Sequence, residues 1–198
     1  MRLVLASASP RRSELLRAAG FAFEVRASDV AEDLPPGVAP EQAAVLLAER
    51  KARAVAAALA GTDAVVLGAD TIVALEEAGV CHLLGKPADA DEARAMLARL
   101  SGSRHAVVTG VAAVRARDGA ATSAWERTFV TMRAILEAEI AAYVDSREWE
   151  GKAGGYAIQE TADRFVTRLE DGGFDNVVGL PVALVRDLLD RLRAAPPP

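Results

Sequence analysis

The spacing of apolar residues along the chain switches repeatedly between the period of a strand and the period of a helix. Extended runs bounded by turn residues predict strands, and longer stretches with apolar positions three or four apart predict helices. The predicted strands are residues 2–6, 21–27, 64–69, 71–75, 80–84, 104–116, 122–133 and 165–170. The predicted helices are residues 10–19, 40–60, 90–100, 137–146 and 181–193.

This order of elements predicts an α/β protein. Helices follow strands in the first half, as in βα units, whereas residues 71–84 and 104–133 read as pairs of antiparallel strands. The run 64–69 is continuously apolar, which is typical of a strand buried on both faces. We therefore expect a mixed twisted sheet flanked by helices, in a single domain over residues 1–193, with residues 194–198 as a C-terminal tail.

The composition supports a protein with a substantial core and excludes several classes. The chain has 198 residues, of which 52% are hydrophobic and only 5% aromatic, so the core is expected to consist mainly of Ala, Val and Leu. No run of 18 apolar residues appears, which argues against a membrane span. The net charge of −5 argues against a general nucleic-acid-binding protein, whose footprint would be a broad basic patch.

The cysteine and histidine content is low. Cys81 is the single cysteine, so no intrachain disulfide can form, which fits a reducing cytoplasm. His82 and His105 are the only histidines, and no Cys/His cluster has the spacing of a zinc site. A cytoplasmic protein without a structural zinc site is therefore expected.

Two adjacent arginines lie at the predicted start of the first helix. Ser9 suits the N-cap and Pro10 suits the first helical position, so Arg11 and Arg12 fall in the first turn. The helix dipole disfavours cations there, but an anion shared by the guanidinium groups and the N–H groups of that turn would reverse the effect. The pattern indicates a phosphate-binding site. Two solvated arginines on an exposed helix start are the alternative.

A carboxylate follows the central apolar strand. Asp70 comes directly after residues 64–69, and ligand and metal sites of α/β sheets gather at the carboxyl ends of strands. It can hold Mg²⁺ or act as a base there, with a turn or capping aspartate as the alternative. Glu32 could supply a second carboxylate from an acidic loop in which Asp29 and Asp33 compete with it, although such charge runs are often simply solvated.

Lysine is scarce and its positions are informative. Only three of the 23 basic residues are lysine, which suggests that lysine is kept where a compact point charge is required. Lys51 lies centrally on the predicted helix 40–60, Lys86 follows a glycine, and Lys152 lies in a Gly-rich segment that ends at Gln159. An amide such as that of Gln159 can donate to or accept from a base edge. Cations with a few carboxylates are what a metal–polyphosphate site requires.

Six segments occur in the order typical of one family. They are Leu5–Leu16, Gly68–Val73, Gly85–Pro87, Leu100–Gly102, Lys152–Gln159 and Val177–Pro181. Together they resemble the Maf (septum formation inhibitor) family of nucleoside triphosphate pyrophosphatases, and the resemblance runs from about residue 3 to residue 190. It implies an α/β fold similar to that of the inosine triphosphate pyrophosphatases, with two lobes around a central cleft, and a homodimer.

The resemblance also implies an activity and roles for individual residues. The implied reaction hydrolyses a nucleoside triphosphate to the monophosphate and pyrophosphate, with Mg²⁺ or Mn²⁺ as the metal cofactor. The implied substrate ligands are Ser7, Arg11, Arg12, Thr71, Lys152 and Gln159. The implied catalytic residues are Lys51, Lys86 and Asp70, with Asp70 activating water, and the implied metal ligands are Glu32 and Asp70.

The same resemblance narrows the substrate. Thr71 and Gln159 match the branch that acts on dTTP and UTP, so these nucleotides and modified pyrimidine nucleotides are the expected substrates. The branch that acts on 7-methyl-GTP differs around both positions and is the first alternative. The second alternative is a nucleotide-responsive regulator of cell division that does not turn its ligand over. No nucleic-acid or membrane partner is expected.

Overall fold

The computed structural model describes residues 2–194, which form two compact units. Unit 1 comprises the described residues 2–70, 109–126 and 179–194. Unit 2 comprises residues 71–108 and 127–178. The expected single domain over residues 1–193 and the expected central cleft therefore remain predictions.

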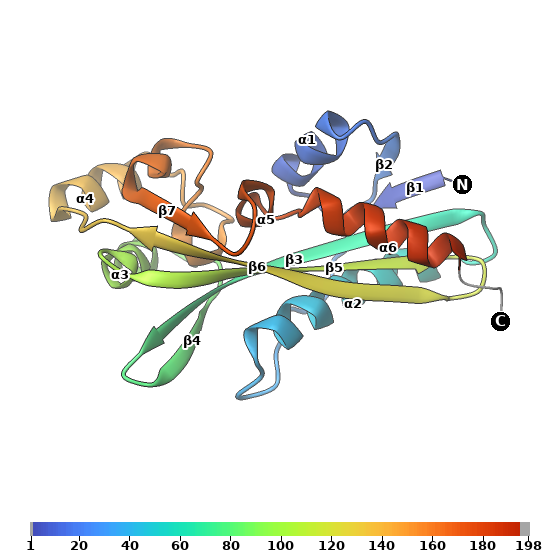
Figure 1. Ribbon diagram of the computed structural model, residues 1–198, viewed down its shortest axis with the longest axis horizontal. Helices are drawn as coiled ribbons and strands as arrows, with labels where there is room; N and C mark the ends of the chain where they lie inside the picture. The colour runs from blue at the N-terminus through green and yellow to red at the C-terminus, as the bar shows by residue number, and fades with distance from the viewer. Residues whose placement is uncertain (1, 195–198) are drawn as a thin grey trace. The chain divides into compact units, whose positions relative to one another are not determined.

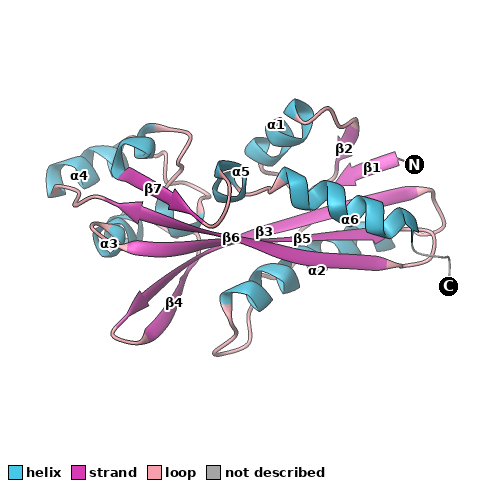
Figure 2. Ribbon diagram, viewed as in Figure 1, coloured by secondary structure: helices cyan, strands magenta, loops and turns pink. Residues whose placement is uncertain are grey.

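Helices and strands together form an α/β architecture (Figures 1 and 2). The strands are β1 (Arg2–Leu5), β2 (Phe23–Val25), β3 (Ala64–Glu77), β4 (Val80–Leu84), β5 (Arg104–Arg115), β6 (Ala121–Met132) and β7 (Val166–Glu170). The α-helices are α1 (Pro10–Ala18), α2 (Pro40–Ala57), α3 (Ala90–Leu100), α4 (Glu137–Asp145), α5 (Phe174–Val178) and α6 (Val182–Ala194). Two short 3₁₀ helices are η1 (Ala153–Gly155) and η2 (Thr161–Phe165).

The strands form one mixed sheet. Its order is β2-β1-β3-β5-β6-β7, and β4 pairs with β3 outside this path. β1 is parallel to β2 and to β3, whereas β4 is antiparallel to β3 and β7 is antiparallel to β6. The expected mixed sheet flanked by helices is confirmed.

Four details differ from the prediction. Residues 64–69 and 71–75 belong to one continuous strand, β3, and the short elements α5, η1 and η2 were not predicted. Ser9 occupies the N-cap of α1, but its side chain makes no capping hydrogen bond. The last helix, α6, includes Ala194, so the expected tail does not begin there, and the rest of it, residues 195–198, lies outside the described residues.

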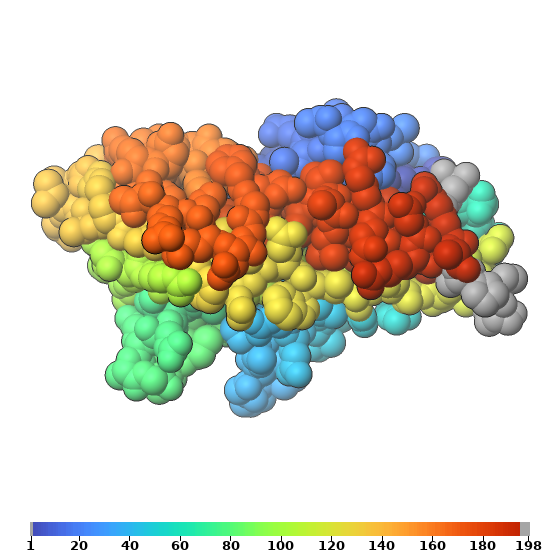
Figure 3. Space-filling model, in the orientation of Figure 1, coloured from blue at the N-terminus to red at the C-terminus, as the bar shows by residue number. Residues whose placement is uncertain are grey.

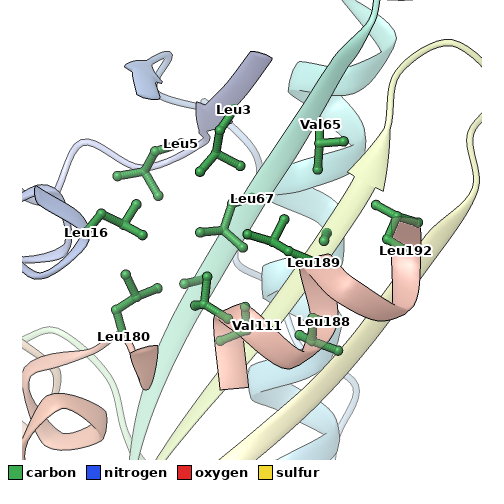
Figure 4. Packing of buried hydrophobic residues seen from close by; sticks show 13 residues of the cluster. Leu3, Leu5, Leu16, Val65, Leu67, Val111, Leu180, Leu188, Leu189 and Leu192 are labelled. Atoms are coloured by element: carbon green, nitrogen blue, oxygen red, sulfur yellow. The ribbon is translucent and has the colours of Figure 1, made fainter. Parts of the chain in front are cut away.

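Unit 1 has an apolar layer on each face of its strands, because side chains alternate along them. Leu3, Leu5, Val65 and Leu67 point to one face, where they pack with Leu16 of α1 and with Leu188, Leu189 and Leu192 of α6 (Figure 4). Val4, Ala64 and Val66 point to the other face, where they pack with Ala48, Ala52 and Val55 of α2. Both sides of β1 and the first half of β3 are therefore covered.

Two glycines let α2 approach the sheet very closely. A Cβ added to Gly68 of β3 would lie 2.3 Å from the carbonyl oxygen of Ala48, and one added to Gly110 of β5 would lie 2.3 Å from the carbonyl carbon and oxygen of Ala44. These distances are far below van der Waals contact, so only glycine fits beneath the helix backbone. The close approach holds the sheet-facing side of α2, which includes Lys51, against the strands.

We expect Gly110→Ala to destabilise the protein by about 1–3 kcal/mol or more, because the new methyl group meets helix backbone that cannot rotate away. Urea denaturation followed by circular dichroism measures this change. Gly85→Ala is the matched control, because a Cβ there meets nothing within 4 Å and its φ is not positive. The control is expected to be neutral or slightly stabilising. Equal effects of the two substitutions would contradict this account of α2 packing.

Unit 2 has its own core and a protruding hairpin. Tyr143 of α4 and Phe165 are fully buried, with their ring centroids 5.8 Å apart in an edge-on arrangement. The turn between β3 and β4 places Ala78 and Gly79 at positive φ, and the green hairpin stands out from the rest of the unit in Figure 3. Among the described helices, none is both long and apolar enough to cross a lipid bilayer.

Candidate active site

The best-defined polar cluster of unit 1 centres on Asp70. It shares a face of β3 with Val66 and Gly68, the face covered by α2, because side chains alternate along the strand. There its Oδ1 accepts a hydrogen bond of 2.5 Å from Nζ of Lys51. Both residues are buried, with 5% and 7% of their surface exposed. An ion pair with this degree of burial requires close geometry to offset desolvation.

The strand environment of Asp70 corrects one expectation. Asp70 does not end a strand, because β3 continues to Glu77. It lies instead where the neighbouring strand changes: β1 pairs with β3 as far as Leu67, and β4 pairs from Val73 onwards. The carboxylate therefore lies just beyond the point where the parallel pairing of β1 with β3 ends. Ligand and metal sites of α/β sheets gather at such carboxyl ends of parallel strands.

The acidic loop supplies a second carboxylate through Glu32. Nζ of Lys51 donates to its Oε1 at 2.7 Å, so one ammonium group bridges Glu32 and Asp70. Nη1 of Arg50 donates to the backbone carbonyl of Asp33 at 2.6 Å, which fastens the same loop to α2. Glu32 is the more exposed partner of Lys51, with 43% of its side chain accessible. The loop thus brings Glu32 to Lys51, while Asp33 contributes its backbone.

Arg12 is held in a fixed orientation by two neighbours. Its Nε donates to the carbonyl of Gly179 at 2.8 Å, and its Nη1 donates to Oγ of Ser7 at 3.1 Å. Burial lowers the pKa of Arg12 and the Asp70 carboxylate opposes this effect, while Arg11 lowers the pKa further. Arginine remains a cation in proteins. Ser7, Arg12, Asp70 and Lys51 therefore belong to one charged neighbourhood in unit 1.

The start of α1 is suited to an anion. Pro10 is the first helical residue, the first turn contains no acidic residue, and no side chain caps it. Arg11 and Arg12 lie in this turn, as predicted. The backbone N–H groups of an uncapped first turn and two guanidinium groups are a favourable combination for phosphate oxygens.

The other four predicted site residues belong to unit 2, and their roles there remain predictions. Thr71 is half-buried on β3, Lys86 is exposed after β4, and Gln159 is exposed. Lys152 is buried, and its Nζ donates to Oε2 of Glu160 at 2.9 Å and to the carbonyl oxygen of Glu148. The structure thus shows Lys152 tied into its own segment.

The Gly-rich segment lies beside the Gly85-Lys86-Pro87 motif. The N–H of Gly154 donates to the carbonyl of Gly85 at 2.9 Å, and Gly154 and Gly155 both have positive φ. Gln159 lies at the end of this segment and lines an open groove of about 510 Å³ in unit 2. The other lining residues are Ile158, Asp163, Val166, Thr167, Arg168, Leu169 and Phe174.

The donor chemistry of unit 1 fits a hard divalent cation. Glu32 and Asp70 offer carboxylate oxygens on either side of one ammonium group. Mg²⁺ is commonly held by one or two carboxylates together with water and substrate phosphates. Among residues 2–194, no group of three or more His, Cys, Asp or Glu side chains is placed to hold a metal ion.

Two anchoring interactions were missed by sequence reasoning. The carbonyl of Gly179, in the motif Val177–Pro181, orients Arg12 across 167 residues of sequence. His105, for which the sequence gives no role beyond the absence of a zinc-type cluster, is buried and contacts the hydroxyl of Tyr156 at 2.9 Å. No sequence pattern could have identified either contact, because both join distant segments.

Several proteins resemble this chain along nearly its whole length. A "dTTP/UTP pyrophosphatase" of Salinibacter ruber is 48% identical over 194 residues, covering 98% of this chain and 90% of the relative. One of Pelotomaculum thermopropionicum is 45% identical, covering 96% and 95% of the two chains. One of Bacillus cereus is 46% identical, covering 94% of each.

A solved structure, the nucleoside-triphosphatase (dITP/XTP pyrophosphatase) of Mycobacterium abscessus, matches with a TM-score of 0.45 and 16% identity, covering 98% of this chain and 96% of the other. The family described as Maf-like protein matches residues 2–192. On this match and on the identities above, the chain belongs to the Maf-like protein family.

Proposed function

We propose that this protein hydrolyses dTTP and UTP to the nucleoside monophosphate and pyrophosphate. This choice of substrates is supported by relatives that are named dTTP/UTP pyrophosphatase and are 43–48% identical to this chain. The single observation that carries the chemistry is the buried Lys51–Asp70 pair with Glu32 on the same ammonium group, near the oriented cation Arg12. Carboxylates beside fixed cations can activate water against a phosphate chain.

The site residues of unit 1 have three kinds of role in this proposal: proton transfer, phosphate binding and metal binding. Asp70 accepts a proton from the attacking water, and Lys51 fixes the direction of its carboxylate. Arg11 and Arg12, with Ser7 and the first turn of α1, bind phosphate oxygens as their negative charge increases. Bound Mg²⁺ or Mn²⁺, held by Asp70 and Glu32, would neutralise part of the phosphate charge.

The remaining assignments are finer parts of the same proposal. Thr71 and Gln159 select the pyrimidine base, and Lys86 and Lys152 contribute positive charge for the substrate. The protein is proposed to act in the cytoplasm and as a homodimer. The single cysteine, which is exposed, supports the cytoplasmic assignment.

Hydrolysis of a nucleotide panel in H₂¹⁸O tests the proposed reaction. The panel contains dTTP, UTP, the six other common ribo- and deoxyribonucleoside triphosphates and 7-methyl-GTP. We expect pyrophosphate as the product, with dTTP and UTP turned over with the highest kcat/KM. The position of the ¹⁸O label, in the monophosphate or in pyrophosphate, identifies the phosphorus that water attacks. Release of orthophosphate, or a strong preference for purines or 7-methyl-GTP, would overturn the proposal.

We expect Arg12→Ala to lower kcat/KM for dTTP by about 10²–10³-fold, with a higher KM and a lower kcat, because a phosphate-binding cation contributes most in the transition state. Steady-state kinetics measures both parameters. Arg17→Ala removes the same charge from the exposed last turn of the same helix and serves as the control. A similar loss in both variants, or an unchanged kcat/KM in Arg12→Ala, would remove Arg12 from the phosphate site.

A further inference from the structure

A series of hydrogen-bonded polar groups in unit 2 starts at Tyr156 of the Gly-rich segment and continues through the buried His105 to Ser103. The hydroxyl of Tyr156 is 2.9 Å from Nε2 of His105, and Nδ1 of His105 is 3.3 Å from Oγ of Ser103. His105 is 1% exposed and Tyr156 is 6% exposed, and their rings meet edge-on at 83°. The proposed chemistry uses none of these three side chains.

The donor and the acceptor of each hydrogen bond among Ser103, His105 and Tyr156 follow from the number of hydrogens that each group carries. Oγ of Ser103 donates its single hydrogen to the carbonyl of Leu100 at 2.8 Å, so it must accept from His105. Burial lowers the pKa of His105 to about 4, which keeps the imidazole neutral with one N–H. That hydrogen lies on Nδ1, so Nε2 accepts from the hydroxyl of Tyr156.

A second tyrosine holds the next residue of the same segment. The hydroxyl of Tyr143 on α4 accepts a hydrogen bond of 3.2 Å from the backbone N–H of Ala157. Tyr143 is fully buried, with 1% of its surface exposed. The segment is thus fixed at Tyr156 through its side chain and at Ala157 through its backbone. Gln159 follows two residues later and is exposed at the edge of the groove.

We propose that His105, Tyr156 and Tyr143 are positioning residues that hold segment 156–159 in one backbone conformation, so that the Gln159 amide meets the pyrimidine base, with Tyr156 donating to Nε2 of His105. This inference rests on the proposed function, because the base is a pyrimidine only if the substrates are dTTP and UTP. An amide can read a base only when its donor and acceptor are held in a defined orientation, and Gln159 itself is exposed. The two buried contacts, at Tyr156 and at Ala157, hold the segment that carries this amide.

The test is the change in base selectivity when one anchor hydroxyl is removed. In Tyr156→Phe and in Tyr143→Phe we expect the ratio of kcat/KM for dTTP to that for dGTP to fall about tenfold, the value of one hydrogen bond of about 1.4 kcal/mol. The change is expected in KM for dTTP, with kcat within about twofold, because the interaction is with the base in ground and transition state alike.

The matched control is Trp149→Phe, which also removes a buried hydrogen bond in unit 2, the one from Nε1 to the carbonyl of Val144 at 3.0 Å. It is expected to leave the dTTP/dGTP ratio unchanged. An equal fall in the ratio in the control, or an unchanged ratio in both tyrosine variants, would overturn the positioning role.

Nitrogen-15 NMR of the His105 imidazole in the unmodified protein provides a measurement that needs no variant to fold. The expected tautomer has its proton on Nδ1, and a proton on Nε2 would overturn the proposed donor order. Failure of the proposed function is distinguishable, because it would appear as missing dTTP turnover in the unmodified protein, before any ratio is compared.

Discussion

Asp70→Asn is expected to lower kcat for dTTP hydrolysis by about 10³-fold, within the range of 10²–10⁴-fold that a positioned base contributes. Asparagine is nearly isosteric and its Oδ1 can still accept from Lys51, which donates to Asp70 at 2.5 Å in the structure. The substitution therefore removes the negative charge and the ability to take a proton, while the packing on α2 is retained. Steady-state kinetics measures kcat, and titration calorimetry with a non-hydrolysable dTTP analogue measures binding.

The Kd of the dTTP analogue is expected to change by no more than about tenfold in Asp70→Asn, because the proposed phosphate ligands Arg11, Arg12 and Ser7 are unchanged. A tenfold change corresponds to the loss of about 1.4 kcal/mol, the size of a single polar interaction. Glu14→Gln, which removes one exposed carboxylate from α1, is the control and should leave kcat unchanged. Unaltered turnover in Asp70→Asn would remove Asp70 from the mechanism. Recovery of kcat at high Mg²⁺ concentration would assign Asp70 to metal binding alone.

The sequence predicts the elements of this fold well because each has a strong local signal. Pro10 is the first residue of α1, Oδ1 of Asp89 caps α3 by accepting from the N–H of Glu92 at 2.8 Å, and Asp118 and Gly119 lie in the turn between β5 and β6. The continuity of β3 through Asp70 was missed because a buried carboxylate reads locally as the end of a strand. In the folded protein the Asp70 carboxylate is paired with Lys51 of α2, 19 residues away in sequence, and β3 continues through it to Glu77.

The candidate site was predictable in its residue types but not in its contacts. Asp29 and Asp33 compete with Glu32 in the acidic loop, and the folded loop shows that it is Glu32 that reaches Lys51. Arg12 could be singled out by its helix position, whereas its anchor at Gly179 depends on tertiary structure. Glycines such as Gly68 carry no local signal that the backbone of α2 will lie too close to leave room for a Cβ.

Lys51→Met is expected to lower the free energy of unfolding by about 3–5 kcal/mol, the usual loss when one partner of a buried ion pair is removed. Methionine fills most of the same volume, so the loss comes from leaving the Asp70 carboxylate without its ammonium partner at 5% exposure. Urea denaturation at neutral pH measures it. The neighbouring Arg50→Met is the control, because it loses a hydrogen bond to the Asp33 carbonyl at an exposed position, and it should lose less than about 1.5 kcal/mol.

Two double-mutant cycles separate the bonds that Lys51 makes. The cycle of Lys51→Met with Asp70→Asn is expected to show a coupling of more than about 2 kcal/mol, because the neutral amide no longer needs the ammonium group. The cycle with Glu32→Gln is expected to show about 1 kcal/mol or less, since 43% of the Glu32 side chain is exposed and solvent screens the pair. Equal couplings would mean that Lys51 is shared evenly between the two carboxylates, and that burial of Asp70 does not make its bond the stronger one. The expected inequality gives Lys51 a primary role in holding Asp70, with Glu32 more readily released towards a metal or the substrate.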